Sequence, residues 1–155
     1  MDMLTPTCAE ELADIVANAA VDGCKLALRG GGSKDGIGAT EPDATIVRMT
    51  GFAAVIDYDP PELVLTVGAG TPLAEVEALV AAQGQMLAFD PFDHGPILGR
   101  AAGQATIGGV IAAGVSGSRR VSAGAVGSST RLCGRVRARR AVRGRREGGQ
   151  ECHRL

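Results

Sequence analysis

The composition of this chain changes abruptly near residue 127, and the change limits how much of the sequence can fold. Residues 1–126 contain 7 Lys and Arg against 15 Asp and Glu, whereas residues 127–155 contain 9 Arg against 2 Glu. The second segment shows neither the period of 2 of a strand nor the period of 3.6 of a helix. Such a segment buries too little apolar surface to offset the conformational entropy lost on folding. We therefore expect a folded unit over residues 1–126 and a disordered, Arg-rich tail over residues 127–155.

Hydrophobic spacing and turn residues predict short helices and strands in alternation over residues 1–126. A capping-box pattern at Thr7–Glu10 begins a helix of about four turns. Thr71, as an N-cap followed by Pro72 at the first helical position, begins a second helix. The small apolar residues of 106–114 predict a third, tightly packed helix. Strands are expected at residues 25–28, 45–49, 54–58, 63–67 and 86–89. This order of elements is typical of an α+β layer fold that binds nucleotides.

Glycine-rich segments indicate where the backbone could approach a ligand closely. Gly30–Ser33 follow a predicted strand and offer consecutive N–H groups that no side chain obstructs, an arrangement suited to a phosphate or pyrophosphate. The segment lacks the Gly-Lys-Ser/Thr of a P-loop and the last glycine of a Rossmann fingerprint, so a flexible turn is the alternative interpretation. Thr106–Gly109 and Ser116–Gly117 are two further segments of this kind, for which helix packing by small residues is the alternative.

Nothing in the sequence indicates a membrane span, a metal site or an identifiable catalytic set. No uninterrupted apolar stretch reaches the ~18 residues of a membrane helix, and residues 1–3 lack the basic start of a signal peptide, so we expect a cytoplasmic chain. The four cysteines are isolated from one another and only two histidines accompany them, so no zinc site is predicted. Catalytic residues stay unassigned, because neither a Ser/His/Asp order nor a carboxylate pair can be identified.

Six segments, in order over about residues 5–126, resemble successive motifs of the FAD-binding subunits of bacterial glycolate oxidase. They lie at residues 29–34 (Arg-Gly-Gly-Gly-Ser-Lys), 58–64, 70–75, 84–91, 106–109 (Thr-Ile-Gly-Gly) and 116–120 (Ser-Gly-Ser-Arg-Arg). The resemblance implies an α+β fold of the vanillyl-alcohol oxidase class. Its PCMH-type FAD-binding domain has two subdomains with the cofactor between them; here the first subdomain would be nearly complete and the second incomplete.

The resemblance also implies a cofactor, a reaction and partners. In the family, FAD accepts electrons as glycolate is oxidised to glyoxylate, in a complex with a second flavoprotein subunit and an iron–sulfur subunit. We expect the same partners and no nucleic acid, with any membrane association made through the complex and no activity for this chain alone. By position, the pyrophosphate loop would be Gly30, Gly31, Gly32 and Ser33, flanked by Arg29 and Lys34, with Thr106, Gly108, Gly109, Ser116 and Gly117 approaching the FAD from the other side.

Two other functional classes fit parts of the sequence. One is a small nucleic-acid-binding protein whose Arg-rich tail contacts phosphates, and the other is a stand-alone module that binds a small molecule on residues 1–126. The tail contains no aromatic residue that could stack on a base. The FAD-binding subunit is therefore the preferred interpretation.

The resemblance stops after residues 124–126. Ser118 replaces a proline of the family, which leaves the loop possible, but the later family motif Lys-Asn-Val-Thr-Gly-Tyr-Asp is absent. Residues 149–155 can be encoded as GGG CAA GAA TGT CAC CGG CTA. Read from the second base, these codons give Gly-Lys-Asn-Val-Thr-Gly and the first two bases of a tyrosine codon. We hypothesise that residues from about 127 onward are the product of a frameshift.

Sequencing the gene across codons 115–155 tests the frameshift. We expect codons 149–155 that encode the family motif when they are read one base later, with a single insertion or deletion near codon 127. Codons that cannot be read in this way would show that the hypothesis is wrong.

Overall fold

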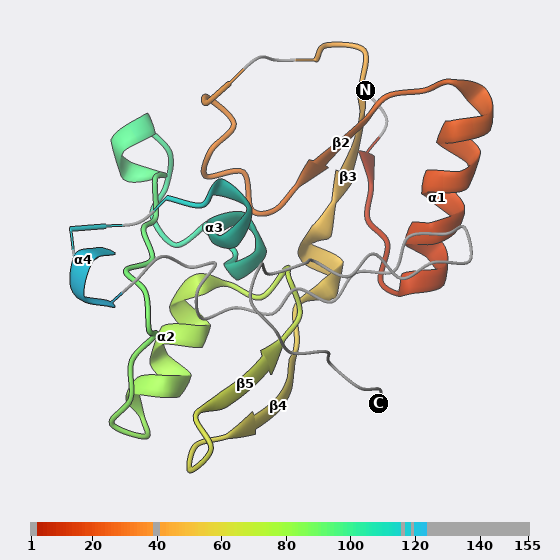
Figure 1. Ribbon diagram of the computed structural model, residues 1–155. Helices are drawn as coiled ribbons and strands as arrows, with labels where there is room; N and C mark the ends of the chain where they lie inside the picture. Colours follow the sequence, from red (N-terminus) through yellow and green to blue (C-terminus); the bar gives the residue numbers. More distant parts are fainter. Residues whose placement is uncertain (1–2, 39–40, 116, 119, 124–155) are drawn as a thin grey trace.

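A computed structural model describes residues 3–38, 41–115, 117–118 and 120–123 (Figure 1). The tail predicted over 127–155 and the predicted site residue Ser116 lie outside these ranges. The strands are β1 (Met3–Leu4), β2 (Leu26–Arg29), β3 (Thr45–Arg48), β4 (Val55–Asp59) and β5 (Val64–Val67). The helices are α1 (Ala9–Asp22), α2 (Leu73–Ala81), α3 (Ile107–Ala113) and α4 (Arg120–Ala123), with 3-10 turns η1 (Met49–Phe52) and η2 (Pro96–Leu98).

Three strands form a parallel sheet in the order β1-β3-β2, and α1 connects β1 to β2. The register of β2 and β3 runs from Leu26 opposite Thr45 to Arg29 opposite Arg48. Two arginines therefore lie side by side at the carboxyl ends of neighbouring parallel strands. In open sheets of parallel strands, this edge is where ligands bind.

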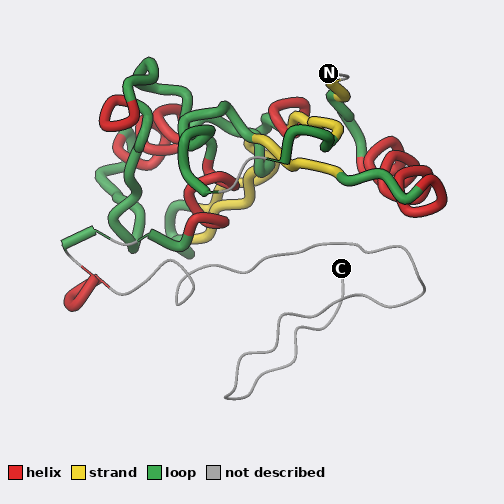
Figure 2. Tube along the Cα trace, turned by 90° about the horizontal axis from the view of Figure 1, so that it is seen from above, coloured by secondary structure: helices red, strands yellow, loops and turns green. Residues whose placement is uncertain are grey.

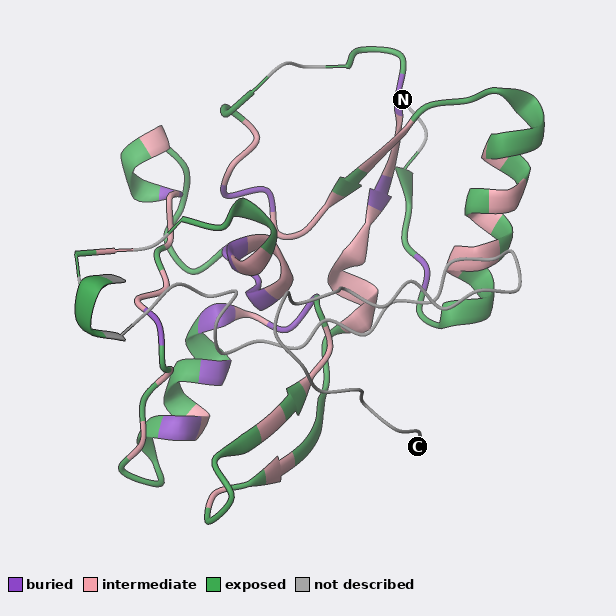
Figure 3. Ribbon diagram, in the orientation of Figure 1, coloured by how far each residue is buried: buried purple, intermediate pink, exposed green. Residues whose placement is uncertain are grey.

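The hydrophobic core lies between the β4-β5 hairpin and helices α2 and α3, to one side of the parallel sheet. The hairpin is antiparallel, with an irregularity between Val55 and Asp57, and its strands lie where strands are predicted, at residues 54–58 and 63–67. Figure 3 shows buried residues on α2 and α3 and on the segments that lead into them, whereas α1 carries no buried residue. Both views place α1 at one end of the molecule, apart from α2 and α3 (Figure 1, Figure 2). The buried cluster consists of Leu73, Val76, Phe89, Ala105, Ile107 and Val110.

The two predicted helix caps differ from the observed ones. At α1 the N-cap is Cys8, and Thr7 bonds to Glu11 instead of Glu10: its N–H and hydroxyl both donate to Glu11 Oε2, at 2.7 and 3.1 Å. These hydrogen bonds from Thr7 hold the pKa of Glu11 below its ordinary value. The sequence pattern therefore predicts the helix correctly but places its N-cap one residue too early, at Thr7 instead of Cys8.

At α2, Thr71 is not the cap, because its hydroxyl makes a tertiary contact. Pro72 occupies the N-cap position, and the fully buried Thr71 accepts a hydrogen bond from Ala54 N–H and donates one to Ala54 C=O, both at 3.1 Å. A hydroxyl that could have capped its own helix instead joins the helix start to the segment before β4.

The strand predicted at residues 86–89 is wrong, since no strand in the described part of the chain includes them. Leu87 and Phe89 do face the core while Met86 is exposed, which explains the strand-like pattern. The segment is anchored by a side chain instead: Gln85 accepts a hydrogen bond from Tyr58 Oη and donates one to Pro60 C=O, each at 2.8 Å. The alternating burial of these residues comes from packing against the core and not from a place in a described strand.

No helix in the described ranges is long and apolar enough to cross a bilayer.

Replacing Thr71 with Val tests the importance of its two hydrogen bonds. The variant keeps the shape of the side chain but removes the acceptor of Ala54 N–H and one of the two donors to Ala54 C=O, which keeps its hydrogen bond from Gly68 N–H. We therefore expect a loss of about 0.5–1.5 kcal/mol in the free energy of unfolding. Urea unfolding followed by circular dichroism measures it. Thr66→Val, at an exposed position of β5, is the matched control and should change little. Equal stability of the two variants would contradict the role given to Thr71.

Candidate cofactor-binding site

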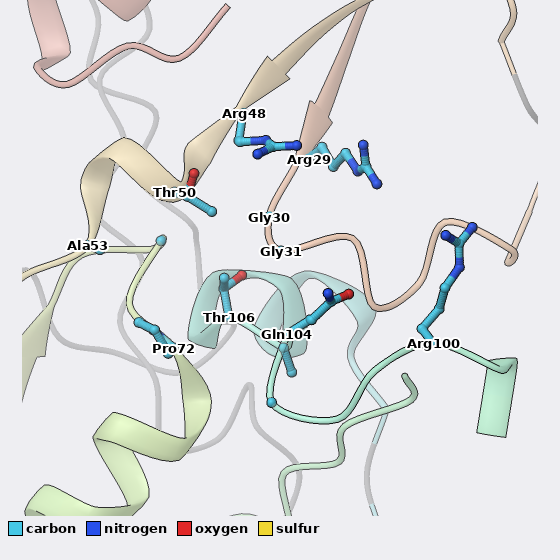
Figure 4. A pocket seen from close by; sticks show the side chains of 13 residues that line it. Arg29, Gly30, Gly31, Arg48, Thr50, Ala53, Pro72, Arg100, Gln104 and Thr106 are labelled. Atoms are coloured by element: carbon cyan, nitrogen blue, oxygen red, sulfur yellow. The ribbon is translucent and has the colours of Figure 1, made fainter. Parts of the chain in front are cut away.

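A cleft of about 580 Å³ opens between the carboxyl ends of β2 and β3 and the start of α3 (Figure 4). Four segments supply its walls: the end of β2, the end of β3 with η1, the start of α2, and the loop before α3. The described residues that line it are Arg29, Gly30, Gly31, Arg48, Thr50, Ala53, Gly70, Pro72, Arg100, Gly103, Gln104, Ala105 and Thr106. Three arginines and no carboxylate are among them.

The glycines that follow β2 are required by close packing of two chain segments. A Cβ at Gly31 would overlap the carbonyl oxygen of Gln104, and a Cβ at Gly30 would overlap the Thr106 hydroxyl. Gly32 has a φ of +86°, a backbone conformation that L side chains rarely adopt. The loop therefore packs closely against residues 104–106.

The loop of residues 30–34 contains backbone N–H groups that have no acceptor among the described residues. Within the described part of the chain, no hydrogen bond has a donor among the backbone N–H groups of residues 30–34. Ser33 is nevertheless buried, with 5% of its surface exposed. Consecutive unpaired N–H groups in a glycine-rich turn form a concave site that favours an anion.

The positively charged side chains at the site differ in the negative charges that lie near them. Arg29 forms a two-point ion pair with Asp35, Nε to Oδ1 at 2.9 Å and Nη2 to Oδ2, and both side chains are about 70% buried or more. Burial lowers the pKa of Lys34, and the charge of Asp93 partly opposes that shift. Arg48 forms no ion pair with any described residue.

Asp93 organises the loop that carries Arg100 and Gln104. Its carboxylate accepts hydrogen bonds from Gly95 N–H at 2.9 Å and from Gly103 N–H at 2.7 Å. One side chain thus closes the loop at both ends. Arg100, one of the residues that line the cleft, is carried by this loop (Figure 4).

The structure brings together only some of the residues predicted to face a cofactor. Arg29, Gly30, Gly31 and Thr106 share the cleft, and Gly32, Ser33 and Lys34 continue its loop. Thr106 is the N-cap of α3, and its hydroxyl accepts from Gly109 N–H at 3.3 Å.

Three other predicted residues lie outside the cleft lining. Gly108 packs on Ala69, with its N–H donating to Ala69 C=O at 2.9 Å, and a Cβ at Gly117 would overlap the Asp90 carboxylate. The N–H of Gly109 donates to the Thr106 hydroxyl, which caps α3. In the described structure, close packing is therefore enough to explain why these three positions are glycines.

Several lining residues were not predicted from the sequence. Arg29 follows the strand predicted at residues 25–28, and Arg48 lies near the end of the strand predicted at residues 45–49, so their shared position at one sheet edge could have been noticed. Thr50, Arg100 and Gln104 reach the cleft only through the fold of the loops that carry them, and no local pattern marks them.

Replacing Gly31 with Ala tests whether the loop is held by packing. We expect a loss of about 1–3 kcal/mol in the free energy of unfolding without any added ligand, because the new Cβ meets the backbone of Gln104. Gly36→Ala is the control in the same loop, since nothing lies within 4 Å of its Cβ position. Thermal unfolding of both variants gives the comparison. A Gly31→Ala protein as stable as the control would rule out the close approach.

Comparison with known proteins agrees with this fold. A family model described as "FAD binding domain" matches residues 3–132. Glycolate oxidase subunit GlcE of Escherichia coli (strain K12) is 36% identical over 118 residues, which cover 76% of this chain and 31% of that protein. The chain thus spans about a third of the length of this curated relative.

Solved structures show the same architecture at lower identity. Two crystal structures of alkyldihydroxyacetonephosphate synthase superpose with TM-scores of 0.60 and 0.59, at 20% and 23% identity. Each superposition covers 81% of this chain and 22% or 24% of the synthase chain. The expected α+β fold is confirmed, and the family match extends over most of the sequence. The chain belongs to the FAD binding domain family.

Proposed function

We propose that this chain binds FAD, with the diphosphate of the cofactor against the loop of residues 30–34. The proposal rests on the N–H groups of this loop, which donate to no acceptor among the described residues. The loop begins at the cleft edge where Arg29 and Arg48 lie. Membership of the FAD binding domain family supports the choice of ligand.

The residues of the cleft fit a diphosphate group. Its lining contains three arginines and no carboxylate, and the pairing of Arg29 with Asp35 leaves an excess of positive charge. A diphosphate carries negative charge and many acceptor oxygens, which N–H groups and guanidinium groups bind well. The cleft volume of about 580 Å³ lies in the range of small-molecule sites.

The remaining predicted residues would then approach the cofactor from the α3 side. Thr106 already lies in the cleft wall, and Gly108 and Gly109 form the first turn of the helix that it caps. Ser116 and Gly117 follow that helix. We propose that this side holds the rest of the FAD molecule.

We propose further that the FAD serves the oxidation of glycolate to glyoxylate in a larger complex. Bound FAD would supply the electron acceptor, while this chain positions it and tunes its electronic properties. The relationship to GlcE supports this assignment. Because the chain covers 31% of that protein, we assign the activity to the complex and not to this chain alone. The resemblance described above implies a cytoplasmic complex with a second flavoprotein subunit and an iron–sulfur subunit.

Titration of the 155-residue protein with FAD tests the binding proposal. We expect saturable quenching of flavin fluorescence and a higher unfolding temperature, because a ligand that binds only the folded state stabilises it. ADP should compete with FAD, since it carries the diphosphate, whereas riboflavin should compete poorly. Absence of saturable FAD binding would refute the proposed function. Competition by riboflavin but not by ADP would refute the placement of the diphosphate.

A further inference from the structure

Arg29 and Arg48 occupy equivalent places in the sheet but differ in their surroundings. The two residues are partners in the parallel register of β2 and β3, one at the carboxyl end of each strand. Figure 4 shows both side chains near Gly30, extending from the ends of β2 and β3. Arg29 uses two nitrogens of its guanidinium group on Asp35. No described carboxylate does the same for Arg48.

The Nε atom of Arg48 is buried and has no hydrogen-bond partner among the described residues. Among the buried side-chain nitrogen and oxygen atoms of the described residues, it alone lacks a hydrogen-bond partner. A buried charged donor without an acceptor is costly, so such groups are usually paired in the final assembly of a protein. The unpaired atom therefore indicates that the described residues do not fully satisfy the Arg48 guanidinium group, which belongs to a side chain that lines the cleft.

We infer that Arg48 is a diphosphate-binding residue, which holds one phosphate group while the loop of residues 30–34 holds the other. This inference rests on the proposed FAD binding and adds a ligand from β3 to a site otherwise made by β2 and its loop. Arginine suits the role because its planar group donates two parallel hydrogen bonds to one phosphate. Arg48 lies outside all six segments that resemble the glycolate oxidase subunits.

The other two arginines of the cleft are less suited to this role. Arg29 is already engaged by Asp35, so binding a phosphate would require it to break or share that pair. Arg100 lies on an exposed loop, where solvent screens its charge. Arg48 alone combines partial burial, an unpaired donor and a position at the carboxyl edge of the sheet.

Two variants and one control separate ligand binding from a structural role. Arg48→Gln removes the charge, and Arg48→Lys keeps the charge but loses the planar fork. Lys25→Gln removes one positive charge at an exposed ion pair with Glu41, away from the cleft lining, and serves as the control. Affinities for FAD and for ADP are measured by fluorescence titration and competition, and unfolding temperatures are measured without ligand.

We expect Arg48→Gln to weaken FAD and ADP binding by the same factor, about 10- to 100-fold, as for loss of one charged hydrogen-bonding group. Arg48→Lys should lose less, and Lys25→Gln should bind as the unmodified chain does. Without ligand, Arg48→Gln should unfold at the same or a higher temperature, because the substitution removes a buried donor that lacks a partner.

Other outcomes would overturn the inference. Unchanged FAD affinity in Arg48→Gln would exclude Arg48 as a ligand residue, and a lower unfolding temperature with unchanged affinity would assign it a structural role. Weaker FAD binding with unchanged ADP affinity would place Arg48 at the flavin instead of the diphosphate. Failure of the unmodified chain to bind FAD would refute the proposed function itself, which distinguishes that failure from an effect of Arg48.

Discussion

Backbone pairing between residues 69–73 and residues 105–108 anchors both helices of the core and the floor of the cleft. Leu73 N–H donates to Ala105 C=O at 2.8 Å, and Ile107 N–H donates to Thr71 C=O at 2.9 Å. The Thr71 hydroxyl extends this junction to the segment before β4. The start of α2, the start of α3 and the hairpin therefore share one hydrogen-bonded centre, and a shift in any of them would move the others.

The junction also determines the electrostatic character of the cleft. It brings residues 104–106 against the loop after β2, so the carboxyl ends of β2 and β3 face a wall of small and neutral residues. Arg29 is balanced by Asp35 from its own loop, a pairing of residues six apart in sequence. Arg48 has no acid close to it in sequence on the loop that follows β3. The two neighbouring cations therefore contribute unequally to the field at the site.

Local patterns predicted most elements of the fold, and they failed where tertiary contacts decided the outcome. The strands ending at Arg29 and Arg48 and the helix over 107–113 follow from hydrophobic spacing and turn residues. Thr71 looked like a helix cap because nothing in the sequence shows that Ala54 lies beside it. Residues 86–89 alternate in burial but have no neighbouring strand in the described chain. The cleft was predictable only as the glycine loop, since Arg100 and Gln104 arrive from a distant loop.

The glycines of the loop after β2 have a role in packing and a second, proposed role in ligand binding. Gly30 and Gly31 are small because residues 104–106 press against them, which is a packing requirement that holds without any ligand. The same packing fixes the loop in a shape whose N–H groups have no acceptor within the described chain. A loop fixed in advance loses less entropy when a ligand binds, so packing on one side supports affinity on the other. In the proposed site, the glycines would preorganise the loop, whereas the arginines would supply the charge that selects an anionic ligand.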